Sequence, residues 1–269
     1  MMHQAQPKDV WAIGAAYEPY VGRWSRLVAR EFLAWLAVPP AKQWLDIGCG
    51  TGALSQIILD VASPSKIKGV DPSEGYIAFA RDQVVDDRVS FTVGDAQALP
   101  FESAQFDVVV SGLVLNFLLH QDRAVSEMLR VVRPGGIAAA YVWDNADQMQ
   151  LMRYFWDAAV KLDPAAFDLD EGQRFLLCKP EPLTKLFHAA NLNNIEVCAI
   201  DVPTDFRDFD DYWKPFLGGQ DPAPTYAMTL SEDRRVALRE EIRANLPIAT
   251  DGAIRLIARA WAIRGVLRL

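Results

Sequence analysis

Apolar and polar positions change their period repeatedly along this chain, and the changes mark two kinds of element. Short runs that are apolar throughout, or apolar at every second residue, predict strands at 43–47, 66–70, 89–93, 106–110 and 137–143. Between these runs, apolar residues recur at steps of three and four and predict helices over 51–61, 74–84 and 122–132. Because alternating strands and helices form parallel sheets, this region predicts a doubly wound α/β fold.

The pattern differs on either side of this region. A helix is predicted over 20–36 and stops at Pro39 and Pro40. The second half predicts helices over 148–162 and 181–190, a strand at 195–202, and aromatic-rich helices and loops over 207–246. The last segment, 253–267, alternates every second residue in its first half. That alternation indicates a final strand, with a helix as the alternative.

These elements predict one structural domain of the α/β class. The expected architecture is a Rossmann-like, doubly wound, mostly parallel sheet of seven strands. We assign residues 1–40 to an N-terminal helical lid, 41–145 to a cofactor-binding core and 146–269 to the remainder of the same sheet, with an inserted helical cap at about 207–250. A chain of this length can bury a full core without disulfides or metals.

Charge and cysteine content exclude several classes of function. The 269 residues carry a formal charge of −8, which argues against tight binding to nucleic acid, because that affinity depends on Lys and Arg. Cys49, Cys178 and Cys198 are scattered, so we expect neither a disulfide framework nor a metal site. We see no signal peptide and no apolar stretch of membrane-spanning length. We therefore expect a cytoplasmic protein without a membrane partner.

A glycine-rich turn, WLDIGCGTGALS at 44–55, follows the first predicted strand. Gly48, Gly50 and Ala53 match G-x-G-x-x-G/A, the pattern of turns that bind the pyrophosphate of a dinucleotide. Asp46 would place a carboxylate against those phosphates, and like charges about 4 Å apart repel by roughly 4 kcal/mol at an effective dielectric constant near 20. S-adenosylmethionine has no phosphate. Its sulfonium and ammonium groups would instead be attracted to Asp46.

Two more acidic residues end the next two predicted strands. Asp71 ends the second strand, where an acid can accept hydrogen bonds from ribose hydroxyls. Asp95 follows the third strand, where a carboxylate could accept a hydrogen bond from the adenine amine. Together with Asp46, these residues suit a cationic nucleoside better than a pyrophosphate. The alternative is that all three are solvated acids at strand ends.

At these residues the chain resembles the class I S-adenosylmethionine-dependent methyltransferases, in particular the type 11 branch that acts on small molecules. The resemblance covers about residues 40–143 and rests on LDIGCGTG, GVDPS, GDAQALPFESAQFDVVVSG and MLRVVRPGG. YEPYVGRWSR and ARAWAIRG, near the two ends, are similar to flanking segments of some bacterial members. The resemblance implies S-adenosyl-L-methionine as cofactor and S-adenosyl-L-homocysteine as product.

The resemblance also implies which residues border the cofactor. The glycine turn would lie beside the methionine part, the GVDPS segment beside the ribose and the segment after the third strand beside the adenine, with the end of the fourth strand supporting the cofactor from below. The implied residues are Asp46, Gly48, Cys49, Gly50, Gly52, Asp71, Pro72, Ser73, Asp95, Ala96 and Ser111. Of these, Cys49 is expected to be a small loop filler.

Tyr20 and Arg23 belong to the predicted N-terminal helix. We expect this segment to close over the cofactor as a lid, with Arg23 pairing the methionine carboxylate. Gly22 favours Arg23 for this role, because it allows an unusual backbone path. The alternative is an amphipathic helix with an exposed basic face.

Candidates for the acceptor site follow from position and apolar character. Ligands of open α/β sheets bind outside the carboxyl ends of the strands. The candidates for a catalytic role, which follow the fourth and fifth strands, are His120, Asn116 and Trp143. The candidates for an apolar substrate pocket are Trp143, Tyr154, Trp213 and Phe216. Aromatic residues at helical spacing can equally form the core of their own helices.

These observations favour SN2 transfer of a methyl group to a small, apolar or aromatic acceptor, by a monomer or a homodimer. The sequence offers no convincing general base, so we expect catalysis by positioning, which can contribute about 7–11 kcal/mol. Two other classes stay open. One is a non-catalytic S-adenosylmethionine-binding or regulatory protein. The other is an NAD(P)-dependent oxidoreductase, which Asp46 disfavours.

Overall fold

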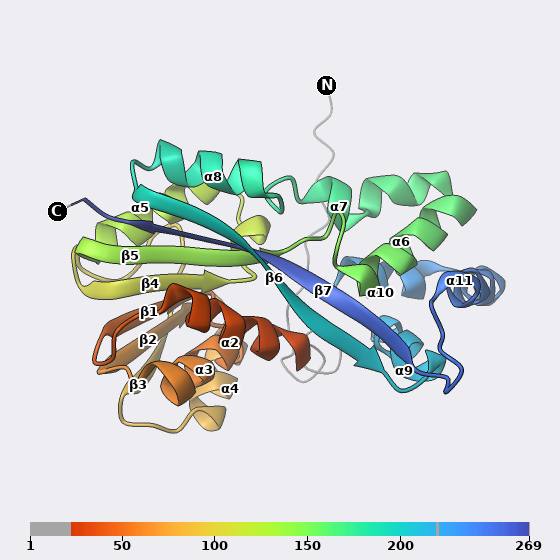
Figure 1. The fold of residues 1–269 in the computed structure, drawn as a ribbon, viewed down its shortest axis with the longest axis horizontal. Helices are drawn as coiled ribbons and strands as arrows, with labels where there is room; N and C mark the ends of the chain where they lie inside the picture. The colour runs from red at the N-terminus through yellow and green to blue at the C-terminus, as the bar shows by residue number, and fades with distance from the viewer. Residues whose placement is uncertain (1–22, 219–220, 269) are drawn as a thin grey trace.

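A computed structural model describes residues 23–218 and 221–268, and its centre is one seven-stranded sheet (Figure 1). The strands are β1 (Gln43–Ile47), β2 (Lys66–Asp71), β3 (Val89–Val93), β4 (Phe106–Gly112), β5 (Val132–Trp143), β6 (Asn193–Phe206) and β7 (Ile254–Val266). Their order is β3-β2-β1-β4-β5-β7-β6; among the described strands, β7 pairs antiparallel with both β5 and β6, and the other pairs are parallel. The predicted mostly parallel sheet is confirmed, including its last strand.

Helices cover both faces of this sheet. The helices α2 (Arg23–Leu36), α3 (Ala53–Ala62) and α4 (Glu74–Gln83) lie on one face, and α5 (Gln121–Val131) and α8 (Pro180–Ala189) lie on the other (Figure 1). Central strands are therefore buried on both sides and are apolar throughout. In β4, Val108 and Val110 pack into the apolar layer beneath α2, while Val109 packs into the layer beneath α5.

The helix α2 is built into the first of these layers. Trp24, Val28, Phe32 and Leu36 recur every four residues and are all buried. They form one apolar stripe, and α2 packs with it against α3 and β6. The helix α2 is therefore part of the hydrophobic core. The rest of the predicted lid, including Tyr20, lies outside the described residues and stays a prediction.

The strands β6 and β7 extend beyond the rest of the sheet and carry the predicted cap. Pairing of β5 with β7 ends at Trp143 and Ala260, whereas β6 and β7 stay paired as far as Phe206 and Ile254. The cap helices between these two strands are α9 (Phe209–Trp213), η4 (Lys214–Leu217), α10 (Pro222–Thr229) and α11 (Glu232–Asn245). These helices occupy the chain between Phe206 and Ile254.

Elements that follow β5 also pack on the cap. They are α6 (Gln150–Leu162), η3 (Pro164–Leu169) and, next to them, α7 (Glu171–Arg174). The ring of Phe155 in α6 stacks on that of Phe216 in η4, with centroids 4.6 Å apart. Two segments far apart in the sequence therefore share one aromatic core at the end of the long β6–β7 pair (Figure 1).

Candidate functional site

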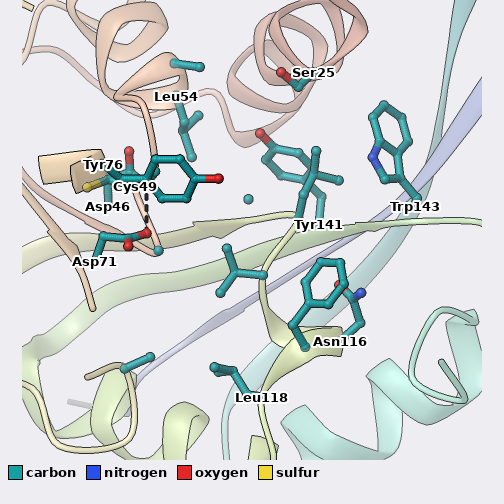
Figure 2. Close-up of a pocket in the computed structure, with 18 of the residues that line it drawn as sticks. Ser25, Asp46, Cys49, Leu54, Asp71, Tyr76, Asn116, Leu118, Tyr141 and Trp143 are labelled. Atoms are coloured by element: carbon teal, nitrogen blue, oxygen red, sulfur yellow. Dashed lines mark hydrogen bonds between the residues drawn. The ribbon is translucent and has the colours of Figure 1, made fainter. Parts of the chain in front are cut away.

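A cavity of about 470 Å³ opens at the carboxyl ends of the parallel strands (Figure 2). Residues from the ends of β1, β2, β4 and β5 line it, together with residues of α2, α6 and α7. Asp71 and Tyr76 lie on one side, which we call the β2 side (Figure 2). Tyr141 and Trp143 of β5 lie on the other side (Figure 2). We call the part of the lining formed by β5 and the chain after it the cap side: Tyr141, Trp143, Asn145, Met149, Met152, Glu171 and Phe175.

The glycine turn after β1 is held by the next strand. The backbone N–H groups of Gly48 and Cys49 donate to the carbonyl oxygen of Val70 at 2.7 and 3.1 Å. Gly50 has a φ of 50°, in the left-handed region that residues with a Cβ rarely adopt. A Cβ at Gly50 would have no atom within 4 Å, whereas one at Gly48 would collide with Val114. The turn is therefore packed on one side and leaves Gly50 open for close approach of a ligand.

Asp71 connects this turn to the loop after β2. Its Oδ2 accepts a hydrogen bond from the backbone N–H of Gly50 at 3.0 Å, and its Oδ1 accepts one from Ser73 at 2.9 Å (Figure 2). Burial raises the pKa of Asp71, and the two N–H donors oppose that rise. Because each carboxylate oxygen has two lone pairs, Asp71 can hold both loops and still accept hydrogen bonds from ligand hydroxyls.

Asp46 lies beside the turn and is 1% exposed. Its Oδ2 accepts a hydrogen bond from the Ser55 hydroxyl at 2.7 Å. Burial raises its pKa to about 7, so roughly half of the molecules carry a proton on Asp46 at neutral pH. The sequence does not show this burial, so the sequence-based estimate assumed a full negative charge on Asp46. A partly protonated Asp46 repels a pyrophosphate less strongly than that estimate gives. A cation bound nearby would draw Asp46 back to its ionised form.

Most of the predicted cofactor-binding residues come together in the cavity. Those that line it are Asp46, Gly48, Cys49, Gly50, Asp71, Pro72, Ser73, Asp95 and Ala96. Asp95 is exposed, and its Oδ1 accepts a hydrogen bond from the backbone N–H of Gln97 at 2.8 Å. Among the described residues its Oδ2 has no hydrogen-bond partner, so this oxygen can accept a hydrogen bond from a ligand.

The other residues that were predicted to border the cofactor do not line the cavity or lie outside the described residues. Gly52 packs towards α4, and Ser111 is fully buried, with its hydroxyl donating to the carbonyl oxygen of Ile47 at 3.1 Å. Neither residue lines the cavity, because β4 turns Ser111 towards the neighbouring strand. Tyr20 lies outside the described residues, and Arg23 begins α2.

Two of the predicted acceptor-site residues, Asn116 and Trp143, line the cavity. In Figure 2 they lie across the cavity from Asp71. Asn116 is 9% exposed and follows β4, and Trp143 is the last residue of β5. Both lie at strand ends, where the open sheet was expected to bind a ligand.

His120, Tyr154, Trp213 and Phe216 do not line the cavity, contrary to the sequence-based expectation. His120 is exposed at the start of α5. Trp213 and Phe216 are buried in the cap, and Tyr154 packs against the same cluster. The aromatic spacing of this region serves the cap's own core, because its helices need an apolar face to pack together.

Several lining residues were not predicted from the sequence, among them Tyr76, Tyr141 and Glu171. The hydroxyl of Tyr76 points into the cavity (Figure 2), and burial raises its pKa to about 12. Tyr141 precedes Trp143 by two residues on β5, so the period of a strand could have placed both on one face. Glu171 follows a 3-10 helix after α6 and carries no comparable signal.

The charges that line the cavity have one sign. The carboxylates of Asp46, Asp71, Asp95, Glu171 and Asp221 line it, and none of the described lining residues is Lys, Arg or His. Such a lining attracts cations and repels phosphates, even when part of the carboxylates are protonated. It can also accept hydrogen bonds from hydroxyl and amine groups.

Residues 45–140 match the family model of the methyltransferase domain. Over 160 residues, the chain is 32% identical to malonyl-[acyl-carrier protein] O-methyltransferase of Methylococcus capsulatus, which covers 56% of this chain and 58% of that protein. Residues 45–140 of this chain therefore form a methyltransferase domain. The chain is also 33% identical over 186 residues to 2-methyl-6-phytyl-1,4-hydroquinone methyltransferase of Synechocystis, covering 68% of this chain and 57% of the relative. The chain thus spans less than two thirds of the length of these relatives.

Solved structures share the fold of the methyltransferase domain. Phosphoethanolamine N-methyltransferase 2 of Haemonchus contortus, in complex with S-adenosyl-L-methionine, has a TM-score of 0.59 at 18% identity, covering 95% of this chain and 56% of that chain. No helix among the described residues is long and apolar enough to cross a membrane. The same residues contain no group of three or more His, Cys, Asp or Glu that could hold a metal ion.

Proposed function

We propose that this protein transfers a methyl group from S-adenosylmethionine to a small, apolar or aromatic acceptor. The observation that carries the proposal is the lining of the cavity, in which carboxylates surround an open glycine turn and no described residue is basic. S-adenosylmethionine combines two cationic groups with ribose hydroxyls and an adenine amine, and it has no phosphate. The relatives named above are methyltransferases, which supports the same assignment.

The residues on the β2 side fit this ligand. Asp71 would accept hydrogen bonds from the ribose hydroxyls, Asp95 would accept one from the adenine amine, and Asp46 with the turn at Gly50 would border the cationic methionine end. When bound, S-adenosylmethionine supplies a methyl group on a positively charged sulfur. The lining fits because the sulfonium, the ammonium, the ribose hydroxyls and the adenine amine can each meet a carboxylate among the described lining residues.

The proposed lid would complete the methionine end. Ser25 in the first turn of α2 lines the cavity. The proposed lid residues Tyr20, which lies outside the described residues, and Arg23 precede it in the sequence, and Arg23 would pair with the methionine carboxylate. An Arg23→Ala variant should then bind S-adenosylmethionine more weakly, with unchanged affinity for adenosine, which lacks the carboxylate.

The chain's own contribution would be orientation and exclusion of water. The cap side presents Trp143, Met149, Met152 and Phe175, which can hold an apolar acceptor against the sheet edge. Positioning of this kind can lower a barrier by about 7–11 kcal/mol. A strongly anionic acceptor would lose its hydration in this cavity, and no described lining residue would supply a positive charge in return.

Calorimetry with S-adenosylmethionine, S-adenosylhomocysteine, NADH and NADPH tests the proposal. We expect binding of the first two only, and Asp71→Asn should weaken that binding by at least about tenfold, or 1.4 kcal/mol. Asp60→Asn is the matched control, because Asp60 is exposed on α3 and does not line the cavity. Binding of NADH, or equal affinities for the two variants, would contradict the proposal.

Turnover separates an enzyme from a binding protein. Formation of S-adenosylhomocysteine should depend on an added acceptor. If the protein binds S-adenosylmethionine but forms no S-adenosylhomocysteine with any acceptor that is added, it is a binding or regulatory protein instead.

A further inference from the structure

Glu171 places a carboxylate on the cap side of the cavity. It lines the cavity, is 3% exposed and begins α7. The indole N–H of Trp156 in α6 donates to its Oε2. Among the described residues, no donor lies within hydrogen-bonding distance of Oε1. One carboxylate oxygen is therefore anchored and the other is left for a ligand.

The backbone that carries Glu171 is fixed on both sides. Asp170 caps α7 by accepting a hydrogen bond from the backbone N–H of Gly172 at 2.8 Å. The guanidinium of Arg153 in α6 donates two hydrogen bonds to the carboxylate of Asp170, one of them to Oδ2 at 3.0 Å. A Cβ at Gly172 would collide with the backbone of Asn145 after β5. The position of Glu171 relative to the end of β5 is thus set by packing.

The surroundings make this carboxylate readily protonated. Burial raises the pKa of Glu171 to about 7, the hydrogen bond from Trp156 opposes the rise, and the neighbouring charges act in both directions. The groups that face Glu171 are Asp170, Arg153, Arg174 and the Cys178 thiol. Cys178 stays neutral, because burial raises the pKa of its thiol well above the neutral range. An acid near neutrality is suited to accept and release a proton.

We propose that Glu171 is the general base of the methyl transfer and that the acceptor carries a phenolic hydroxyl. The inference rests on the proposed function. A buried N–H such as that of Trp156 needs only a neutral acceptor, so a structural role alone does not account for a desolvated carboxylate that also lines the cavity. The aromatic lining of Trp143 and Phe175 suits the ring of a phenol, and Oε1 of Glu171 suits its hydroxyl.

The step balances with the groups named. The phenol O–H bond breaks as Oε1 of Glu171 takes the proton. A lone pair of the phenolic oxygen forms the new O–CH₃ bond, while the S–CH₃ bond breaks and its electron pair stays on sulfur. The positive charge of the sulfonium and the negative charge of Glu171 are both neutralised. The products are a methyl ether, S-adenosylhomocysteine and protonated Glu171, which returns its proton to water.

The test compares Glu171→Gln with wild type on two phenols. The glutamine oxygen can still accept the hydrogen bond from Trp156, so the variant should fold. The first acceptor is 4-methylphenol, the side chain of tyrosine, whose pKa near 10 makes it depend on a base. The second is 4-nitrophenol, which is mostly ionised at about pH 8 and needs none. Glu181→Gln, an exposed glutamate at the start of α8, is the matched control.

At saturating S-adenosylmethionine, we expect Glu171→Gln to lower kcat for 4-methylphenol by about 10²-fold or more. Its loss on 4-nitrophenol should be less than about tenfold. The wild-type kcat for 4-methylphenol should rise with pH as Glu171 ionises, and the variant should lack this rise. Equal losses on both phenols, or the same pH profile in both proteins, would assign Glu171 a structural role.

A third outcome separates this inference from the proposed function. If calorimetry shows that the same preparation binds S-adenosylmethionine but neither phenol yields S-adenosylhomocysteine, the acceptor class is wrong and the proposed cofactor stands. If S-adenosylmethionine does not bind, the proposed function itself fails.

Discussion

Replacing Asp46 with Asn should stabilise the fold and weaken ligand binding at the same time. The carboxylate is 1% exposed, and among the described residues its side-chain partner is the hydroxyl of Ser55. Burial raises its pKa from 3.8 to about 7, so the folded protein holds a proton on Asp46 more tightly than the unfolded chain does. Stability from this residue is therefore fully present below about pH 4 and is lost as the pH rises to about 7.

The size of the effect follows from the shift in pKa. A rise of about three units corresponds to about 4 kcal/mol of lost stability above pH 7, at 1.36 kcal/mol per unit. At pH 5 the loss is only about 1.5 kcal/mol, since the folded form is then largely protonated. Asn removes the charge and keeps an oxygen for Ser55, so Asp46→Asn should gain roughly 1–3 kcal/mol at pH 8 and clearly less at pH 5.

The affinity for a cationic ligand should change with pH in the direction opposite to the change in stability. A cationic ligand binds the ionised form of Asp46, and the ionised fraction falls from about 0.9 at pH 8 to about 0.1 at pH 6. The affinity of the wild type for S-adenosylmethionine should therefore fall about tenfold between these pH values. The Asn variant should bind more weakly at pH 8 and show a flatter dependence on pH.

Urea denaturation at pH 5 and 8 and calorimetry at pH 6, 7 and 8 measure the two effects. Asp86→Asn is a control of opposite sign, because Arg88 lowers the pKa of the exposed Asp86 to about 2 and its removal should slightly destabilise the protein at pH 8. A variant less stable than wild type at pH 8, or an affinity for S-adenosylmethionine that is constant from pH 6 to 8, would refute the reasoning.

Three further predictions concern the turn, the cap and the support of α7. Gly50→Ala should cost about 1–2 kcal/mol of stability, because φ is 50° there, and should lower the affinity for S-adenosylmethionine at least about tenfold, because its methyl enters the cavity. Phe155→Ala should destabilise by about 3–5 kcal/mol in urea, since the ring is fully buried against Phe216. Asp170→Asn should destabilise by about 3 kcal/mol, because it leaves Arg153 buried without its charge partner.

Exposed counterparts give the controls for these variants. Leu217→Ala, at a side chain that is 42% exposed next to Phe216, should change stability by less than about 0.5 kcal/mol. Asp201→Asn removes a partly exposed ion pair with Arg259 and should cost less than about 1 kcal/mol. If either control destabilises as much as its buried counterpart, burial is not the cause. An unchanged affinity of Gly50→Ala would place the ligand away from the turn.

The sequence by itself determined the sheet, the β2 side of the cavity and two residues opposite that side. The strand pattern is local, because alternation and apolar runs depend on neighbours a few residues away. Parallel strands then bring their carboxyl ends to one edge, so the sequence alone places Asp46, Asp71 and Asp95 together. Asn116 and Trp143 followed from the same rule, and all five line the cavity.

The tertiary structure decided the protonation of Asp46 and the other side of the cavity. The pKa of a carboxyl depends on how completely water is excluded, which the sequence of a strand end does not show. Glu171 reaches the cavity because Arg153 and Gly172 fix α7 against the end of β5. Such contacts join segments far apart along the chain. A local sequence pattern does not predict such contacts, because they form only when the layers of the fold pack together.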